Sequence, residues 1–234
     1  MTIALQPIAT IHTPYKQKFA IPRQPGLAKH AFGLIEFLPE FADPNCLRGI
    51  EQFSHLWLVF QFHQTAQQGW SPMVRPPRLG GNKKMGVFAT RSTFRPNHMG
   101  LSVVEFVGVE HSNGKLILKV CGMDLLDGTP ILDIKPYIPY ADSYSEAQGG
   151  FAQEQPQLMA VSYSPVALDQ LSYWQQTYPQ LRQLITEVLA QDPRPAYKAN
   201  TELDKIYGMS LYELNIQWHV VDNCCEVLDI KQNV

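Results

Sequence analysis

Short apolar runs separated by turn residues recur through the first part of the chain, at residues 3–11, 32–37, 55–62, 103–109, 116–120 and 131–134. Runs of this length with no helical repeat between them are typical of strands. Asn113-Gly114 lies between two runs and predicts a hairpin, because this pair readily takes positive φ angles. We expect Asp127-Gly128 to form a second turn of similar type. The pattern predicts a small antiparallel barrel or sandwich.

A different pattern follows a polar stretch, residues 141–157, where we place a domain boundary. Ser164-Pro165 predicts the start of a helix, because serine caps helices and proline suits the first helical position. We expect Leu168, Leu171 and Trp174 to share one face of this helix. A second amphipathic helix is predicted from the apolar residues Leu181, Leu184, Ile185, Val188 and Leu189.

Alternating apolar positions reappear over residues 212–220, and after Asp222-Asn223 a second run continues to Ile230. This predicts a hairpin with one buried face. The chain is therefore expected to be mainly β, with an N-terminal antiparallel β-barrel domain at residues 1–145 and a small C-terminal α+β domain at residues 158–234.

Charge is concentrated in one segment. The net charge of the chain is −2, which does not suit a protein wrapped in nucleic acid. However, residues 52–104 lack acidic side chains and carry +6, which leaves −8 for the remainder. The segment is a candidate for contact with an anion, and a solvated basic loop is the alternative.

Several kinds of site are disfavoured. No GxGxxG sequence follows a strand and no Walker-type loop is present. The histidines and cysteines lack the spacing of metal ligands, so we expect no structural metal. The carboxylates of Asp124, Asp127 and Asp133 are suitable ligands for magnesium. The alternative is that Asp127 is present because an Asp-Gly pair favours a turn. The first residues lack a basic n-region and are broken by Pro7, so we expect no signal peptide or spanning helix, and a cytoplasmic protein.

Two segments remain as candidates for chemistry. Residues 91–97 place two arginines, Phe94 and Asn97 after a strand, and such groups suit phosphate, base stacking and a base edge. The alternative is a surface loop in which Arg95 stacks on Phe94 for structural reasons. Residues 124–130, which run on to Tyr137, offer backbone groups and carboxylates for a ribose or an amine.

Longer blocks of the sequence resemble the TrmO family of tRNA methyltransferases, in both proposed domains. These blocks are PRQPGLAK, FSHLWLVFQFHQ, RPPRLGGN, GVFATRSTFRPN, DLLDGTPILDIKPY and QDPRPAY. The resemblance implies a β-barrel methyltransferase domain, a homodimer, and a pocket for S-adenosylmethionine near the subunit interface. It also implies methyl transfer to N6 of N6-threonylcarbamoyladenosine beside the tRNA anticodon.

The resemblance also implies roles for individual residues. Those expected around the cofactor are Gln24, Pro25, Gly26, His63, Gln64, Arg91, Leu101, Asp124, Leu125, Leu126 and Asp127. Those expected to contact RNA are Arg75, Arg78, Lys83, Arg95 and Asn97, together with Arg194 and Tyr197, which would help to receive the anticodon stem-loop.

One position departs from the family pattern. This chain has His98-Met99 where the family commonly has Pro-Ile, and losing that proline relaxes the backbone. His98 is given no catalytic role, because the usual residue does not titrate. No residue is a convincing general base, although Asp127 is the first to test. A non-catalytic RNA-binding adaptor and a metal-dependent hydrolase remain the alternative functions.

Overall fold

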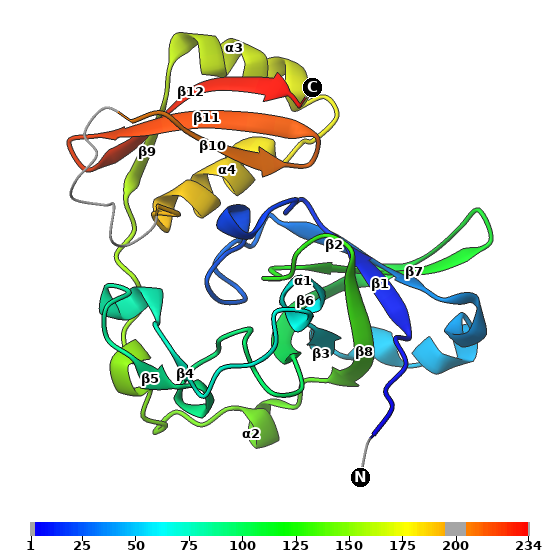
Figure 1. Ribbon diagram of the computed structural model, residues 1–234. Coiled ribbons are helices and arrows are strands. Elements are labelled where there is room, and N and C mark those ends of the chain that lie inside the picture. The colour runs from blue at the N-terminus through cyan, green and yellow to red at the C-terminus, as the bar shows by residue number, and fades with distance from the viewer. Residues whose placement is uncertain (1–2, 195–204, 234) are drawn as a thin grey trace.

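The computed structural model describes residues 3–194 and 205–233, and it shows one large sheet in each half of the chain and a small two-stranded ribbon (Figure 1). The mainly β prediction is confirmed, with an N-terminal antiparallel sheet and a smaller C-terminal part that contains both helices and strands. No helix in the described ranges is both long and apolar enough to cross a membrane.

Six strands form the N-terminal sheet in the order β1-β2-β7-β6-β3-β8, and β1 also pairs with β8, so the sheet closes into a barrel. All neighbours are antiparallel. Closure leaves no free edge to pair with another chain. The strands are β1 (Ala9–His12), β2 (Phe32–Phe37), β3 (His55–Gln61), β6 (Met99–Ser112), β7 (Lys115–Cys121) and β8 (Thr129–Pro136).

Alternation along the strands fills the barrel. In β3, Leu56, Leu58 and Phe60 are buried whereas the residues between them are half-buried, as expected for side chains that point to opposite faces in turn. Gly100 lies on the inner face of β6, and a Cβ atom there would overlap the Phe60 ring. Glycine is therefore needed at this position for the ring to sit in the core.

The two predicted turns differ. Asn113 and Gly114 both have positive φ (52° and 74°) between β6 and β7, which confirms the predicted hairpin. Before β8, only Gly128 has positive φ, at 76°. The Thr129 amide donates to the Leu126 carbonyl at 3.3 Å. The second turn is thus not of the same type as the first, because Asp127 keeps the ordinary backbone conformation.

A long connection joins β3 to β6. It contains only short elements: α1 (His63–Ala66), β4 (Met73–Val74), β5 (Met85–Gly86) and two 3-10 turns. β4 pairs with β5, and this small ribbon lies beside the barrel (Figure 1). Residues 75–95 of this connection, called the basic segment below, contain all six cations of the acid-free stretch. α2 (Pro139–Asp142) follows β8.

The C-terminal sheet has the order β10-β11-β12-β9, and β9 is parallel to β12. Its strands are β9 (Ala160–Tyr163), β10 (Tyr207–Leu211), β11 (Leu214–Val221) and β12 (Cys224–Gln232), and its helices are α3 (Pro165–Trp174) and α4 (Leu181–Ala190). The predicted β11–β12 hairpin is confirmed, with positive φ at Asp222 and Asn223. β9 and β10 were not predicted.

The two helices agree unequally with their sequence patterns. The Ser164 hydroxyl accepts a hydrogen bond from the Ala167 amide at 3.1 Å, so the predicted cap is confirmed. Leu168, however, is 39% exposed, and Ala167 and Leu171 are the buried residues of α3. The prediction for Leu168 was wrong because the buried face of α3 contains Ala167, one position earlier in the chain, and not Leu168. All five apolar residues predicted for α4 are buried.

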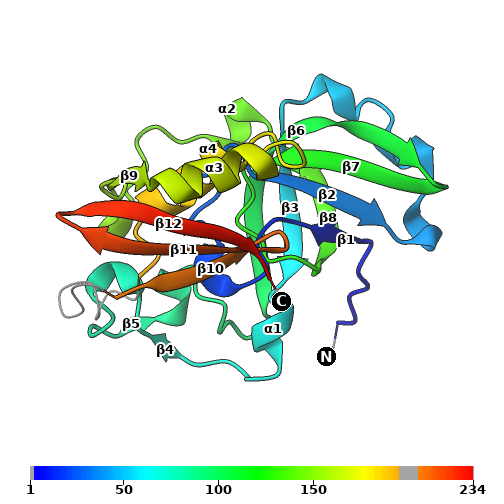
Figure 2. The same cartoon turned by 90° about the horizontal axis from the view of Figure 1, so that it is seen from above.

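The C-terminal domain packs against the connection between β1 and β2 (Figure 2). The buried side chains of both parts form one continuous core. Tyr15 makes an isolated antiparallel bridge with Leu211, and the Tyr212 amide donates to the Pro14 carbonyl at 2.8 Å. The Tyr15 side chain is fully buried. The two halves of the chain therefore share an interface that includes backbone hydrogen bonds.

Candidate functional site

Residues 24–26 lie in the connection between β1 and β2, close to the end of β7. The Gly26 amide donates to the Gly122 carbonyl at 2.8 Å. Both glycines have positive φ, and a Cβ atom at Gly122 would lie 3.7 Å from Gly26 Cα. The close approach of the two backbones places the loop against the strand end, and only glycine takes these φ angles without strain.

Arg91 and Asp124 approach the same loop from two other directions. The Arg91 guanidinium donates to Gln24 Oε1. Asp124 follows Gly122 in the chain, and its Oδ1 accepts a hydrogen bond from the Ser102 hydroxyl on the inner face of β6. Because Gln24, Gly26, Arg91 and Asp124 are among the residues expected around the cofactor, we call them, together with Ser102, the cofactor cluster. It brings together four segments that are far apart in the sequence.

The electrostatics of Asp124 distinguish it from an ordinary surface carboxyl. Burial raises its pKa, and this effect exceeds the opposing effects of the Ser102 hydrogen bond and the Arg91 charge. Ser102 is 2% exposed, so its hydroxyl is shielded from water. A ligand that supplies positive charge or hydrogen-bond donors stabilises the ionised form of such a carboxyl.

Asp127 has a different environment, although it is only three residues away. Its Oδ1 accepts from the Thr13 amide at 2.9 Å and its Oδ2 from Lys16 Nζ at 2.6 Å. The Asp127 amide donates to the Tyr15 carbonyl at 2.9 Å. These bonds tie the turn to the end of β1. Its role as a base remains a prediction.

The leucines between these aspartates differ in exposure. Leu125 is 1% exposed, and its carbonyl accepts from Thr13 Oγ1 at 3.1 Å. Its side chain belongs to the core, so only its backbone could reach a ligand. Leu126 is half-buried, and its carbonyl accepts from the Thr129 hydroxyl at 2.7 Å.

The other predicted cofactor residues lie where β3 ends and β6 begins. His63 and Gln64 start α1, and burial lowers the pKa of His63. Leu101 is 56% exposed on the outer face of β6, opposite to the face that carries Ser102. The structure therefore does not bring the Leu101 side chain together with Asp124.

His98, the residue that departs from the family pattern, forms the turn before β6. Its φ is 50°, a value that proline cannot adopt. Its carbonyl accepts from the Phe62 amide at 2.8 Å, next to His63. Its Nδ1 is buried without a hydrogen-bond partner among the described residues. The altered residue thus supports the segment that enters α1.

The cations predicted to bind RNA differ in their exposure and in their hydrogen-bond partners. Arg75 and Lys83 are exposed on the basic segment. Arg78 donates to the Glu154 carbonyl. Arg95 donates to the Val87 and Thr90 carbonyls at 3.3 and 2.7 Å.

Arg95 also lies over the Phe88 ring, 5.9 Å from its centroid. The ring that pairs with Arg95 is therefore Phe88 and not the neighbouring Phe94. Asn97 is exposed. In the C-terminal domain, Arg194 pairs with both carboxylate oxygens of Asp192 at 2.7 and 2.8 Å. Tyr197 lies outside the described residues.

The end of α4 contacts the connection that carries Gln24, which the sequence did not predict. Glu187 accepts from the His30 amide at 3.0 Å and contacts His30 Nδ1 at 2.7 Å. Gln191 accepts from the Arg23 amide at 3.3 Å and donates to the Leu27 carbonyl at 3.5 Å. Gln191 begins the QDPRPAY block, which was the only sequence signal for this contact.

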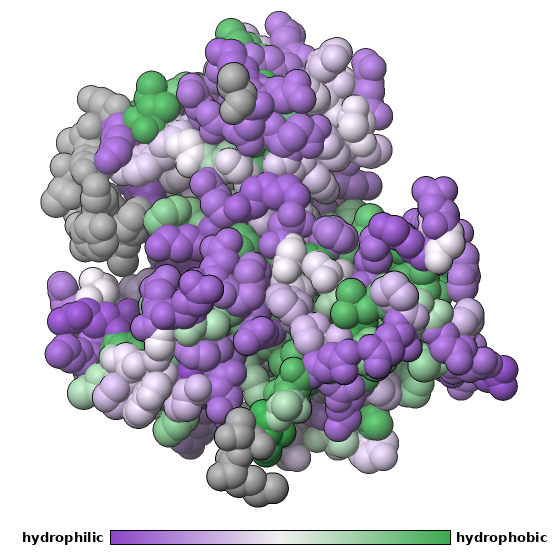
Figure 3. All heavy atoms as spheres, turned by 45° about the vertical axis from the view of Figure 1, so that its right-hand side comes forward, coloured by the Kyte–Doolittle hydropathy of each residue, from purple (hydrophilic) through white to green (hydrophobic). Residues whose placement is uncertain are grey.

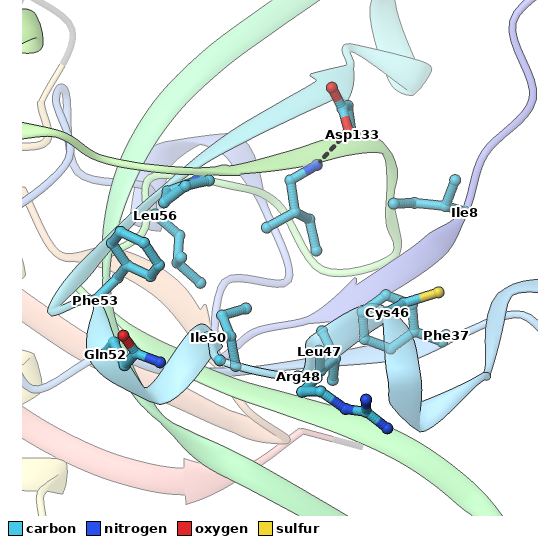
Figure 4. A pocket seen from close by; sticks show the side chains of 13 residues that line it. Ile8, Phe37, Cys46, Leu47, Arg48, Ile50, Gln52, Phe53, Leu56 and Asp133 are labelled. Atoms are coloured by element: carbon cyan, nitrogen blue, oxygen red, sulfur yellow. Dashed lines mark hydrogen bonds between the residues drawn. The ribbon is translucent and has the colours of Figure 1, made fainter.

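One cavity of about 490 Å³ is lined by none of the residues predicted to bind the cofactor or RNA, although Asp133, which was considered for magnesium, lines it (Figure 4). It is mostly apolar, with Ile8, Phe37 and Leu56 among its lining residues, beneath the 3-10 turns that follow β2. The face of the molecule shown in Figure 3 is mostly hydrophilic, with apolar residues in small groups. Among the residues the structure covers, no group of three potential metal ligands occurs.

Comparison with known proteins gives consistent results over both halves of the chain. Residues 10–143 match the family model of the tRNA-methyltransferase O N-terminal domain, and residues 156–233 match that of the TrmO C-terminal domain. A tRNA (adenine(37)-N6)-methyltransferase from Escherichia coli is 50% identical over 225 residues, which is 96% of each chain.

Two further similarities come from Pseudomonas aeruginosa. One protein, 49% identical over 94% of this chain and 93% of its own, carries a name that describes an S-adenosylmethionine-dependent methyltransferase. A crystal structure of TrmO from the same species has a TM-score of 0.82 and 42% identity, and the match covers 99% of each chain.

Proposed function

Because the chain belongs to the tRNA-methyltransferase O family, we propose that it transfers a methyl group from S-adenosylmethionine to N6 of adenine 37 in tRNA. The observation that carries this proposal is the E. coli relative, which has this activity in its name and matches 96% of both chains. We propose that the substrate is the N6-threonylcarbamoyl form of this adenosine and that the product carries both groups on N6.

The cofactor cluster suits this cofactor chemically. S-adenosylmethionine carries a carboxylate, an ammonium, a sulfonium and ribose hydroxyls. Arg91 offers a fork of donors for a carboxylate, and Asp124 offers an acceptor for cations or hydroxyls. The backbone at Gly26 allows close approach because glycine has no side chain. We place Gln24, Pro25, Gly26, Arg91 and Asp124 around the cofactor, with the segment 125–127, His63 and Gln64 completing the pocket. Leu101 joins it through its backbone only, because its side chain lies on the outer face of β6.

The reaction depends more on the alignment of N6 with the methyl group than on acid–base chemistry. When bound, the cofactor supplies a methyl group that is already activated on sulfur. The protein must hold N6 in line with that group and exclude water, and such orientation alone accelerates reactions strongly. The carbamoyl substituent makes N6 easier to deprotonate than a plain amine. Asp127→Asn should therefore retain most of the single-turnover rate, and a complete loss would identify Asp127 as the base.

We propose that residues 1–145 form the β-barrel methyltransferase domain and that residues 158–234 help to receive the anticodon stem-loop. A tRNA substrate would place the reaction in the cytoplasm. A homodimer is supported by exposed apolar side chains on the outer face of the barrel. Phe32 and Leu34 in β2 are each 41% exposed, and Val107 in β6 is 44% exposed. Exposed apolar groups of this kind commonly mark interfaces.

The direct test is methyl transfer from labelled S-adenosylmethionine into tRNA with and without the threonylcarbamoyl group. We expect incorporation only into the modified tRNA, with the label on N6 of adenine 37. Incorporation into both would limit the claim to adenine 37 of any tRNA. No incorporation into either would overturn the proposed function.

A further inference from the structure

A second cavity, of about 470 Å³, lies where the two domains and the basic segment meet. Three stretches line it: residues 18–23 before the cofactor loop, residues 75–81 of the basic segment, and residues 188–194 at the end of α4. The lining residues are Lys18, Phe19, Ile21, Pro22, Arg23, Arg75, Pro77, Gly81, Val188, Gln191, Pro193 and Arg194.

The lining of this junction cavity is cationic. Among the described residues that line it, four side chains are positively charged and none is acidic. Arg194 is neutralised by its paired contact with Asp192. Lys18, Arg23 and Arg75 are exposed, and none of them forms an ion pair within the described part of the chain. Like charges gathered in a hollow raise the local positive potential and attract anions.

Arg23 is held in place from the C-terminal domain. Its guanidinium donates to the Asp192 carbonyl at 3.1 Å, and its amide donates to Gln191 at 3.3 Å. A guanidinium has five N–H donors, so one such bond leaves others for a ligand. Its contact with a backbone carbonyl fixes the side chain without cancelling its charge. Arg23 therefore combines a fixed position with a full positive charge.

The cavity also adjoins the cofactor loop. Arg23 directly precedes Gln24 in the chain, so their Cα atoms are about 3.8 Å apart. Phe19 is 49% exposed and Lys18 Nζ lies 5.0 Å from the centroid of its ring. An exposed aromatic ring beside cations is the arrangement on which unpaired bases stack in single-stranded RNA. An anion bound here would belong to the nucleotide at the cofactor or to its neighbour.

We propose that the junction cavity binds an anionic group of the RNA substrate through Arg23 and Arg75, and that this contact fixes the target nucleotide beside the cofactor. The inference rests on the proposed function. The anion is either a backbone phosphate or the carboxylate of the threonylcarbamoyl group on the target base. A carboxylate is planar and a phosphate is tetrahedral, and an arginine guanidinium binds either group through two hydrogen bonds.

The test is equilibrium binding of an anticodon stem-loop RNA, with and without the threonylcarbamoyl group, over a series of salt concentrations. Arg23→Ala and Arg75→Ala are compared with the unchanged chain and with Arg48→Ala, a control that removes one exposed cation lining the other cavity. We expect about tenfold weaker binding for each test variant and a salt slope lower by about 1, with little change for the control.

The two RNAs separate the sources of the anion. A loss confined to the modified RNA supports the carboxylate, and an equal loss with both RNAs supports a phosphate. Affinities equal to that of Arg48→Ala with both RNAs would overturn the inference. Arg23 also joins the domains, so the unfolding temperature is measured for each variant. Arg75→Ala tests anion binding separately, because Arg75 does not have this structural role.

Failure of the inference is distinguishable from failure of the proposed function. If the unchanged chain methylates tRNA while Arg23→Ala and Arg75→Ala bind RNA like the control, only the inference fails. If the unchanged chain transfers no methyl group, the proposed function fails whatever these affinities are.

Discussion

The cofactor cluster and the basic segment contrast in how their side chains are held. In the cluster, Ser102 is almost fully buried and bonds to Asp124, and the loop at Gly26 is fixed by a backbone hydrogen bond to Gly122. In the basic segment, Arg75 and Lys83 are exposed, with only short elements around them. One region is organised before its ligand arrives, whereas the other presents charge on loops.

This difference indicates what each region contributes. A small cofactor is recognised by a few polar groups in fixed positions, so each group there should matter individually. RNA is attracted by the sum of many charges, so a cation outside the junction cavity should matter modestly and in a salt-dependent way. The variants below test that distinction, from the largest expected effect to the smallest.

Asp124→Ala should have the largest effect. It removes the only acidic side chain of the cofactor cluster, and hydrogen bonds to charged groups contribute roughly 1.5–3 kcal/mol. We therefore expect affinity for S-adenosylmethionine to fall by about 10- to 100-fold in calorimetric titration. Asp169→Ala on the exposed side of α3 is the matched control. Equal affinities of the two variants would contradict the assignment.

Ser102→Ala should have a smaller effect of the same kind. The hydroxyl that bonds to Asp124 is lost, and the carboxyl keeps its place but not its orientation. A cost of about 1 kcal/mol predicts roughly fivefold weaker cofactor binding. Ser102→Thr keeps the hydroxyl and should recover part of the loss. A variant that binds the cofactor normally but unfolds at lower temperature would show that Ser102 is only structural.

The raised pKa of Asp124 predicts how cofactor affinity depends on pH. A cationic ligand favours the carboxylate and lowers its pKa, so binding releases a proton and affinity should rise as pH rises through the raised pKa. In the free protein the sign is opposite. The protonated carboxyl stabilises the fold at low pH, and this contribution is lost as pH rises through the folded-state pKa. Asp124→Asn should abolish both dependences.

Arg78→Ala should have the smallest effect. Its guanidinium already donates to the Glu154 carbonyl, and it is one cation among several. We expect RNA binding about two- to threefold weaker and a slightly lower salt slope, with cofactor affinity unchanged. Filter binding at several salt concentrations measures both quantities. A change in cofactor affinity as large as that of Ser102→Ala would remove the distinction between the two regions.

The sequence predicted local features better than distant contacts. The buried face of α4 and the Asn113-Gly114 hairpin follow from spacing and from the φ angles a residue tolerates, and both are confirmed. The pairing of Ser102 with Asp124 was not predicted, because it depends on which strands become neighbours. The contact between Gln191 and Arg23 joins residues from opposite ends of the chain, and no local pattern encodes it.

Arg95 illustrates the same limit within a short segment. Its nearest aromatic neighbour in the sequence is Phe94, yet it lies over Phe88 and donates to two carbonyls of the turn around that residue. Adjacent residues in an irregular segment point in different directions, so spacing alone could not identify the partner.

Single-turnover methyl transfer into threonylcarbamoyl-modified tRNA, with cofactor and RNA varied separately, tests the central claim most directly. The account predicts that Asp124→Ala raises the cofactor concentration needed for half-maximal rate and leaves that for RNA unchanged. Arg75→Ala should do the reverse, because its charge serves RNA alone. The account is contradicted if both variants change the half-maximal concentration of the same ligand, cofactor or RNA. It is also contradicted if the unchanged chain transfers no methyl group.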